Sequence, residues 1–252
     1  MLQMTTYGDD ATRPPVLIVH GLFGSGRNWR AIARRMARTR RVVTVDMRNH
    51  GSSPWADSQS YPDMAADLAE MIGMLGGQAD VLGHSMGGKA AMVLALHSSE
   101  LVRRLLVADI APVAYAHSQS HLVDAMQGLD LKQFTTRSMA DAALENSIET
   151  PEVRAFLLQS LDLEQHRWRL NLDVLARDMG LITGFPDISG RFDGPALFLS
   201  GAESDYVLPA YRARIKELFP HARFAKIPGA GHWLHAERPR AFIAAAEAFL
   251  NS

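Results

Sequence analysis

Short, uninterrupted runs of apolar residues recur along the chain, separated by stretches whose apolar positions follow a helical spacing. Such runs are typical of strands that are buried on both faces of a parallel sheet. Between two of them, Met64, Leu68 and Met71 share one helical face. The pattern predicts a mostly parallel, doubly wound α/β sheet. Its six expected strands are 16–20, 42–46, 81–82, 105–109, 196–200 and 224–227.

The alternation of strands and helices stops between residues 113 and 190. No strand-like run occurs there, whereas signals for helix starts multiply: Ser138–Asp141 resembles a capping box, and in Thr150–Pro151 a capping residue precedes a first-turn proline. We therefore expect 113–190 to be an inserted helical cap, or lid. Residues 1–112 and 191–252 would together form the core domain.

The segment Gly83–Gly87 joins an expected strand to a helix-forming stretch and reads Gly-His-Ser-Met-Gly. It fits G-x-S-x-G, the pattern of a nucleophile elbow. A serine that attacks carbonyl groups must project from a sharp turn in a strained backbone conformation. The residues two before and two after it approach each other closely, and glycine at both places removes a Cβ clash. The pattern predicts Ser85 as a nucleophile.

The same stretch also matches the start of a phosphate-binding loop. Gly83 to Lys89 reads G-x-x-x-x-G-K, but Ala90 stands where a Ser or Thr hydroxyl would hold Mg²⁺. This interpretation also gives Ser85 no reason to be serine. We therefore expect no nucleotide site here, and Lys89 is expected to be a structural or surface residue of the helix.

The composition narrows the choice of partners. The chain has 252 residues, a formal net charge of −1 and no cysteine. The near-neutral charge gives no reason to expect a nucleic acid or a membrane surface as partner, and no apolar run is long enough to cross a bilayer. The absence of cysteine excludes disulfides and a thiol nucleophile. We expect a cytoplasmic protein, monomeric or a small homo-oligomer, that acts on a small molecule.

A serine hydroxyl needs a neighbouring base, and an imidazole is suited to that role. His232 follows the last expected strand in a glycine-rich loop. An acid between Ser85 and His232 would give the chain order Ser, acid, His. Two acids compete: Asp109 directly follows a strand, and Asp205 lies one place beyond Ser204, which occupies the usual acid position. A buried Asp must be paired, whereas a loop Asp can cap a helix, which favours Asp109 and leaves Asp205 as the alternative.

Backbone N–H groups are expected to stabilise the oxyanion that forms on the substrate. Met86 follows the nucleophile and supplies one donor, and Leu22, in the loop after the first expected strand, supplies the other, with Phe23 as its alternative. The substrate pocket is expected to be lined by Phe23, His84, Trp168 and Trp233.

No metal or other cofactor is expected. His117 and His121 are four positions apart and His232 and His235 three apart, but neither pair belongs to a motif such as H-E-x-x-H. The polar loop Arg48–Ser53 is expected to hold other loops around the site.

These motifs resemble the α/β-hydrolase superfamily, and more narrowly the small bacterial cytosolic esterases of the YbfF type. The likeness extends nearly from end to end of the chain. It is carried by segments 20–25, 46–51, 83–89, 109–113, 168–171 and 229–233.

The resemblance implies an α/β-hydrolase fold with a helical cap and no cofactor. It also implies a serine esterase or thioesterase that acts on small to medium acyl chains through an acyl-enzyme on Ser85. It adds support for Asp109, because this branch tends to lack the acid after the later strand. Two alternatives stay open: a carbon–carbon bond hydrolase of the same fold, and a ligand-binding or signalling protein that keeps the triad but turns over little.

Overall fold

The computed structural model describes residues 1–252 and contains a seven-stranded sheet in the order β1-β3-β2-β4-β5-β8-β9. All neighbouring strands are parallel except the β1–β3 pair. The predicted α/β class and mostly parallel sheet are confirmed. The sequence does not reveal β1, an edge strand that is only partly buried. The strands are Met4–Tyr7 (β1), Val16–Val19 (β2), Val42–Val45 (β3), Ala79–His84 (β4), Val102–Ala108 (β5), Ala196–Gly201 (β8) and Ala222–Ile227 (β9).

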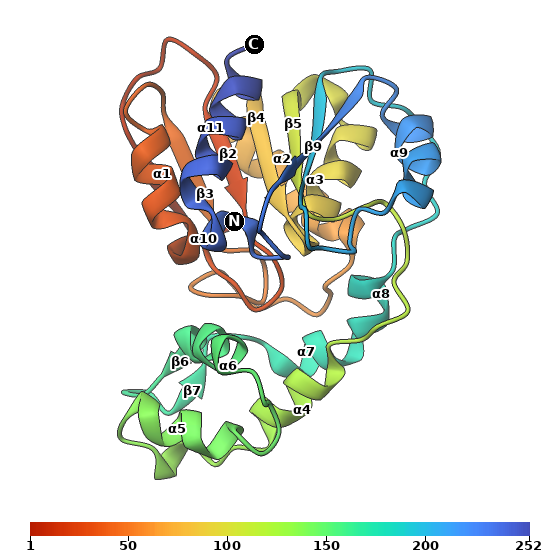
Figure 1. The fold of residues 1–252 in the computed structure, drawn as a ribbon. Coiled ribbons are helices and arrows are strands. Elements are labelled where there is room, and N and C mark those ends of the chain that lie inside the picture. Colours follow the sequence, from red (N-terminus) through yellow and green to blue (C-terminus); the bar gives the residue numbers. More distant parts are fainter.

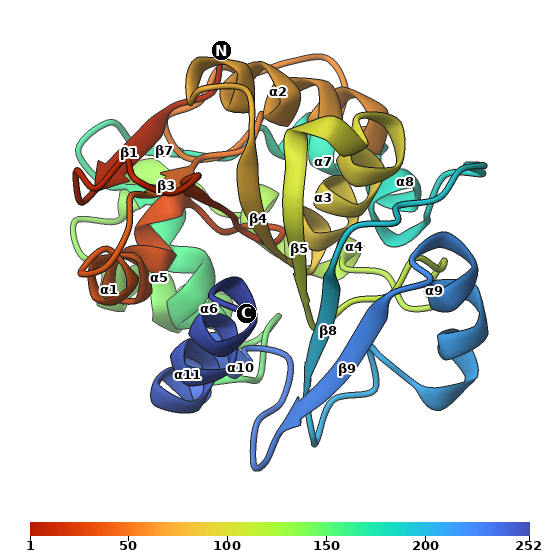
Figure 2. The same ribbon diagram turned by 90° about the horizontal axis from the view of Figure 1, so that it is seen from above.

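Helices cover both faces of the sheet (Figures 1 and 2). Neighbouring residues of one strand point to opposite faces: Ile18 packs in one apolar cluster, and Leu17 and Val19 in the other. Because both faces are covered, the strands read as continuous apolar runs. One face carries α1 (Arg30–Met36), α10 (Leu234–Glu237) and α11 (Pro239–Leu250), and the other carries α2 (Tyr61–Met74), α3 (Met86–His97) and α9 (Arg212–Leu218).

Between β5 and β8 the chain leaves the sheet and forms a separate group of short elements at one end of the molecule (Figure 1). This group lies within the segment expected to be a cap, 113–190. Its helices are α4 (Ser120–Gln127), α5 (Arg137–Leu144), α6 (Pro151–Leu157), α7 (Leu172–Arg177) and α8 (Met179–Thr183). Short 3₁₀ turns lie at Gly26–Trp29, Ser99–Leu101, Leu131–Gln133, Leu158–Ser160 and Pro209–Tyr211.

Two details of this segment differ from the sequence expectation. It contains a two-stranded antiparallel pair, β6 (Leu161–Asp162) and β7 (Arg167–Trp168), although no strand was expected there. Strands of two residues are too short to show an alternating pattern. The expected capping box at Ser138 is also wrong: Thr136 caps α5, and its side chain accepts a hydrogen bond from Met139 N.

The loop Arg48–Ser53 joins the core to this segment. The Asn171 amide N–H donates to Asn49 O over 3.0 Å, and the Gly51 N–H donates to Arg169 O over 2.8 Å. A hydrogen bond of 3.0 Å between the side chains of Asn171 and Asn49 adds to these contacts. The loop therefore ties the stretch between β7 and α7 to the core.

None of the helices combines the length and the hydropathy that are needed to cross a bilayer.

Candidate active site

Ser85 lies at the turn between β4 and α3 with φ 52° and ψ −122°, a conformation that is strained for any residue other than glycine. The two flanking glycines are required by space. A Cβ on Gly83 would lie 2.4 Å from the Gly87 carbonyl oxygen, and a Cβ on Gly87 would lie 2.4 Å from that of His20. The local geometry is that of a nucleophile elbow, with the serine at the tip of a sharp turn.

Asp109 directly follows β5, is fully buried and also has a positive φ of 52°. Its Oδ2 lies 2.8 Å from Nδ1 of His232 and accepts a second hydrogen bond, of 2.5 Å, from the Ser204 hydroxyl. Its Oδ1 accepts from the Gly201 N–H over 3.0 Å. Asp205 is exposed and makes no hydrogen bond to His232. The structure brings together His232 and Asp109, not His232 and Asp205.

Tyr206, which was not among the expected site residues, packs against His232. Its ring stacks on the imidazole with a centroid separation of 4.0 Å and an interplanar angle of 23°. The Tyr206 carbonyl accepts from the Tyr115 hydroxyl over 2.7 Å, and the Tyr206 hydroxyl lies 2.8 Å from Nε2 of His117. Burial raises the pKa of both tyrosines. The one sequence signal was the position of Tyr206 next to Asp205.

The loop after β2 presents one free backbone donor beside Ser85. The Phe23 N–H is already used, because it donates to Nε2 of His50 over 3.2 Å, and Nδ1 of the same ring donates to Arg48 O over 2.9 Å. The Leu22 N–H has no hydrogen-bond partner in the structure. Met86 is the first residue of α3, so its N–H has no acceptor within the helix. Of the two expected loop donors, the geometry favours Leu22 over Phe23.

Neutral histidines surround the site. Burial lowers the pKa of His20 to about 4 and those of His50 and His235 to about 3. Burial likewise lowers the pKa of His84 well below its usual value. Nε2 of His84 lies 2.9 Å from the His232 carbonyl, and the His235 ring stacks on an aromatic side chain of the 3₁₀ turn before α1. These imidazoles stay uncharged at neutral pH, and that of His84 contacts the backbone of His232.

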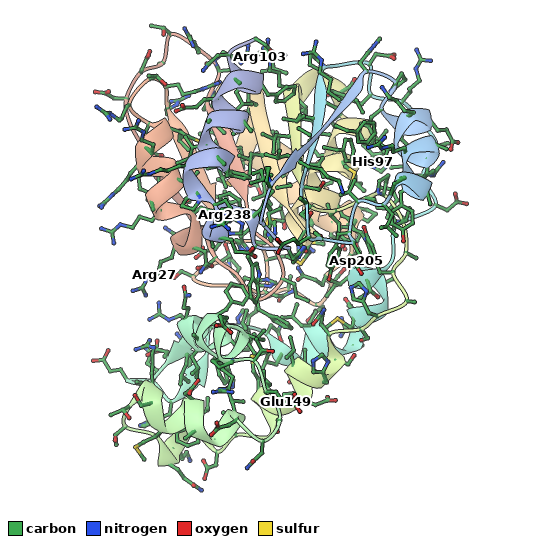
Figure 3. The ribbon with its side chains drawn as sticks, in the orientation of Figure 1. Arg27, His97, Arg103, Glu149, Asp205 and Arg238 are labelled. Atoms are coloured by element: carbon green, nitrogen blue, oxygen red, sulfur yellow. The ribbon has the colours of Figure 1, made fainter.

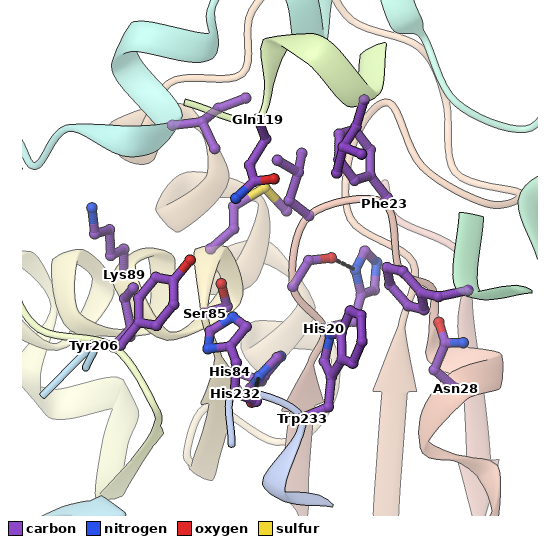
Figure 4. Close-up of a pocket in the computed structure, with 18 of the residues that line it drawn as sticks. His20, Phe23, Asn28, His84, Ser85, Lys89, Gln119, Tyr206, His232 and Trp233 are labelled. Carbon is purple, nitrogen blue, oxygen red and sulfur yellow. Dashed lines mark hydrogen bonds between the residues drawn. The ribbon is translucent and has the colours of Figure 1, made fainter. Parts of the chain in front are cut away.

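A cavity of about 250 Å³ opens beside Ser85, between the sheet and the cap segment (Figure 4). Figure 4 shows Ser85, His232 and Tyr206 on one side, and Phe23 and Asn28 on the other. The lining includes Leu22, Phe23, His84, Met86 and Trp233, together with Leu122, Val153, Phe156, Leu157 and Ile182 from the cap segment.

Trp168 requires a correction, because it does not line this cavity. Its side chain is buried inside the cap segment, where Nε1 donates to Met126 O over 3.0 Å. The aromatic wall that the cap contributes is Phe156, whose ring lies 5.5 Å from that of Trp233. An indole N–H seeks a partner when it is buried, and here that partner is a cap carbonyl rather than a ligand.

The family model of the alpha/beta hydrolase family matches residues 16–246. The chain belongs to this family. It is 42% identical over 253 residues to the sn-1-specific diacylglycerol lipase ABHD11 of Mus musculus, covering 96% of this chain and 82% of that protein. It is 39% identical over 240 residues to esterase YbfF of Escherichia coli strain K12, covering 94% and 93%. The resemblance to esterases of the YbfF type is confirmed.

A solved structure of a marine microorganism esterase has the same fold. It superimposes with a TM-score of 0.93 at 38% identity and covers 98% of both chains.

Lys89 of this α/β hydrolase is a buried residue rather than a surface one. Its ammonium group donates to the carbonyls of Thr183, over 2.9 Å, and Gly184, over 2.5 Å, where α8 ends. It also lies 4.7 Å from the centre of the Tyr115 ring. Burial lowers its pKa to about 7. The side chain ties the end of the cap segment to α3, which agrees with a structural role.

No group of three or more His, Cys, Asp or Glu side chains in the hydrolase is arranged to hold a metal ion. His117 contacts the Tyr206 hydroxyl, and His235 stacks on Trp29. His117 and His121 therefore form no joint site with a third ligand, and neither do His232 and His235.

Proposed function

We propose that this chain is a serine hydrolase that cleaves carboxylic esters or acyl thioesters with small to medium acyl chains. In this proposal Ser85 is the nucleophile, His232 the general base and acid, and Asp109 the residue that orients His232. One observation carries it: the 2.8 Å contact between His232 and the buried Asp109 lies beside a serine on a strained elbow. A serine, a base and an orienting acid in this order form a known acyl-transfer arrangement.

The chain is an ester hydrolase of the α/β-hydrolase family. Relatives at 42% and 39% identity over nearly its whole length are named as a lipase and an esterase. The fold alone would not support the roles of individual residues or thioester activity, because this fold carries many chemistries.

In the first half of the proposed reaction the Ser85 oxygen attacks the acyl carbon while Nε2 of His232 takes its proton. The carbonyl oxygen becomes an oxyanion that accepts from the N–H groups of Met86 and Leu22. The carbon–oxygen or carbon–sulfur bond of the substrate then breaks. The leaving alcohol or thiol takes the proton from His232, and the acyl group stays on Ser85.

In the second half a water molecule attacks the acyl-enzyme and gives its proton to His232. The carboxylic acid leaves, and the proton returns to the Ser85 oxygen. Asp109 accepts from Nδ1–H throughout, so Nε2 keeps the lone pair that the reaction needs. The Ser85 hydroxyl and the His232 ring are not hydrogen-bonded in the structure, and such contacts commonly tighten only when substrate is bound.

The size and lining of the cavity support the limit on acyl chain length. A volume of about 250 Å³ with apolar walls from the cap suits an acyl group of modest length. We also propose the segment 113–190 as the cap that excludes water from this group.

The test is hydrolysis of p-nitrophenyl esters of increasing acyl length by wild type and by Ser85→Ala. The variant is expected to lose roughly 10⁴-fold or more in kcat, because the nucleophile is gone. Circular dichroism of both proteins checks that the variant is folded. Activity retained by Ser85→Ala would contradict the assignment, and no turnover of any ester by wild type would favour the ligand-binding alternative.

A further inference from the structure

A second cleft adjoins the Ser85 cavity on the flank where the core meets the cap segment. It has a volume of about 500 Å³, and only two of its 18 lining residues are hydrophobic. Phe23, Gly24 and Asn28 line both this cleft and the Ser85 cavity. The two spaces are therefore neighbours that share a wall, one largely apolar and the other polar.

Four arginines line this second cleft, which we call the arginine cleft: Arg27, Arg30, Arg34 and Arg169. Arg30 and Arg34 lie one helical turn apart on α1, and Arg27 lies in the 3₁₀ turn before it. Figure 3 shows Arg27 on the flank between the core and the cap segment. Arg169 approaches from the cap side and is paired with Asp162 over 2.9 Å.

The positive charge on the core side of the cleft is not neutralised within the protein. The side chains of Arg27, Arg30 and Arg34 form no salt bridge and no hydrogen bond to another residue in the structure, whereas several arginines elsewhere are paired. Residues 26–45 contain seven arginines and no acidic residue, in a chain whose net charge is −1. Such an uncompensated cluster attracts anions.

One carboxylate, Asp46, also lines the cleft. Its Oδ1 accepts from the Gly26 N–H over 2.7 Å and its Oδ2 from the Ser52 N–H over 2.8 Å. These bonds hold the carboxylate against the backbone, so it does not pair with the arginines. With Arg169 neutralised by Asp162 and the Asp46 carboxylate also counted, the three unpaired guanidinium groups still leave the cleft with a net positive charge.

We propose that the arginine cleft binds a phosphate group carried by the leaving group of the substrate. This inference rests on the proposed function. An acyl chain is apolar and fits the cavity beside Ser85, which leaves the adjoining polar cleft for a charged leaving group. Guanidinium groups bind phosphate through paired, charge-assisted hydrogen bonds. Asn28, whose side chain donates to Gln159 over 2.7 Å, lies at the boundary of the two spaces.

The shared chemistry is a phosphate monoester at the far end of an alcohol or a thiol. Two matched pairs of substrates distinguish a phosphorylated thiol from a phosphorylated alcohol as the leaving group. One pair is butyryl-pantetheine and its 4′-phosphate, and the other is 1-butyryl-glycerol and its 3-phosphate. Within each pair the scissile bond and the acyl group are the same, and only the phosphate differs.

Wild type is expected to hydrolyse the phosphorylated member of at least one pair with a kcat/KM about tenfold above that of its neutral partner. The pair that shows the preference identifies the leaving group as a thiol or an alcohol. The preference should shrink when NaCl is raised to about 0.5 M, because salt screens contacts at an exposed site. Equal or lower kcat/KM for the phosphorylated member of both pairs would overturn the proposal.

The variant Arg27→Gln/Arg30→Gln/Arg34→Gln is expected to reduce the ratio of phosphorylated to neutral kcat/KM to about one, mainly through KM. The control is Arg35→Gln/Arg38→Gln, which alters two exposed arginines of the same basic segment that do not line the cleft. It removes two positive charges, against three in the triple variant, and should keep the ratio of wild type. If the triple variant is unstable, the single variant Arg30→Gln replaces it and should show a ratio between that of wild type and one.

The two proposals fail in different ways. If wild type hydrolyses neutral esters through Ser85 but shows no phosphate preference, the cleft proposal falls and the proposed function stands. If Ser85→Ala is as active as wild type, the proposed function itself falls. If the control variant loses the ratio as fully as the triple variant, overall charge and not the cleft is responsible, and the cleft proposal is overturned.

Discussion

The sheet core and the cap segment are built in different ways. In the core, strands β2, β3, β4 and β8 are buried at every residue. In the cap segment the helices are short, and α5, with eight residues, buries only Ala140 and Leu144. A residue in a doubly covered sheet is fixed by neighbours on both sides, whereas a short half-exposed helix is held by few contacts.

Because of this difference, the proposed reacting residues lie in one region and much of the cavity wall lies in the other. Ser85 follows β4, Asp109 follows β5 and His232 follows β9, so all three come from the ends of core strands. The cap segment adds mainly apolar side chains such as Val153 and Phe156. We infer that the core sets which reaction occurs and that the cap sets which acyl group fits. Changes in the core should therefore act on kcat and stability, and changes in the cap wall on the choice of acyl group.

The largest expected effect comes from the acid in the core. Asp109→Asn should lower kcat by about 10⁴-fold, because an amide at this place favours the wrong tautomer of His232. Asp205→Asn, the matched change in the neighbouring loop, should stay within about threefold of wild type, since Asp205 is exposed and makes no bond to His232. The measurement is kcat with a p-nitrophenyl ester under saturating conditions.

The ranking of the two variants decides the assignment. A larger loss in Asp205→Asn than in Asp109→Asn would transfer the acid role to the later loop. Thermal unfolding of both variants is needed as a control, because Asp109 is buried and also accepts bonds from Gly201 and Ser204.

The positions of Ser85, Asp109 and His232 at one edge of the sheet could be predicted, because parallel strands place their carboxyl ends together. Ser85 and His232 have motifs of their own, and Asp109 directly follows a buried run. Ser204 could not be assigned from the sequence. It stands where an acid is usual, and only the folded chain brings its hydroxyl to the carboxylate of Asp109.

The cap side was less predictable. Phe156 and Trp168 are both aromatic residues of short elements, and nothing in their spacing tells which one faces the cavity. Trp168 was expected to line the cavity, and the structure places Phe156 there instead. Tyr206 was also missed, because its contact with His232 depends on the path of a loop and not on a repeating pattern.

The core should lose stability in acid because it buries several neutral histidines. Burial lowers the pKa values of His20, His50 and His235 to about 4, 3 and 3, and it also lowers that of His84 well below its usual value. In the unfolded chain these groups take up protons below about pH 6.5, while in the folded chain they stay neutral. Unfolding therefore binds protons. As the pH is lowered from 6.5 to about 4, the free energy of unfolding should fall by about 1.4 kcal/mol per pH unit for each group.

Urea unfolding at pH 7.5, 6 and 5 measures this loss of stability. The variant His235→Phe shows how much of the loss comes from one histidine. Phenylalanine can keep the stacking on Trp29, where the ring centroids lie 4.1 Å apart, but it cannot bind a proton. It also removes the unpartnered Nδ1 of His235. The variant should lose about 1.4 kcal/mol less per pH unit than wild type in the same window. An identical pH dependence in both proteins would show that His235 is not a buried neutral group.

The smallest expected effect tests the cap as the element that sets the acyl group. Phe156→Ala should enlarge the cavity and shift the preferred p-nitrophenyl ester to a longer chain, changing the ratio of kcat/KM for long and short esters by roughly tenfold. Trp168→Phe is the matched change. It removes the hydrogen bond to Met126 O inside the cap segment and should cost about 1 kcal/mol of stability. The ratio should stay that of wild type, because this side chain does not line the cavity. A shift in chain-length preference from Trp168→Phe as large as that from Phe156→Ala would mean that the packing of the whole cap, and not its wall, selects the acyl group.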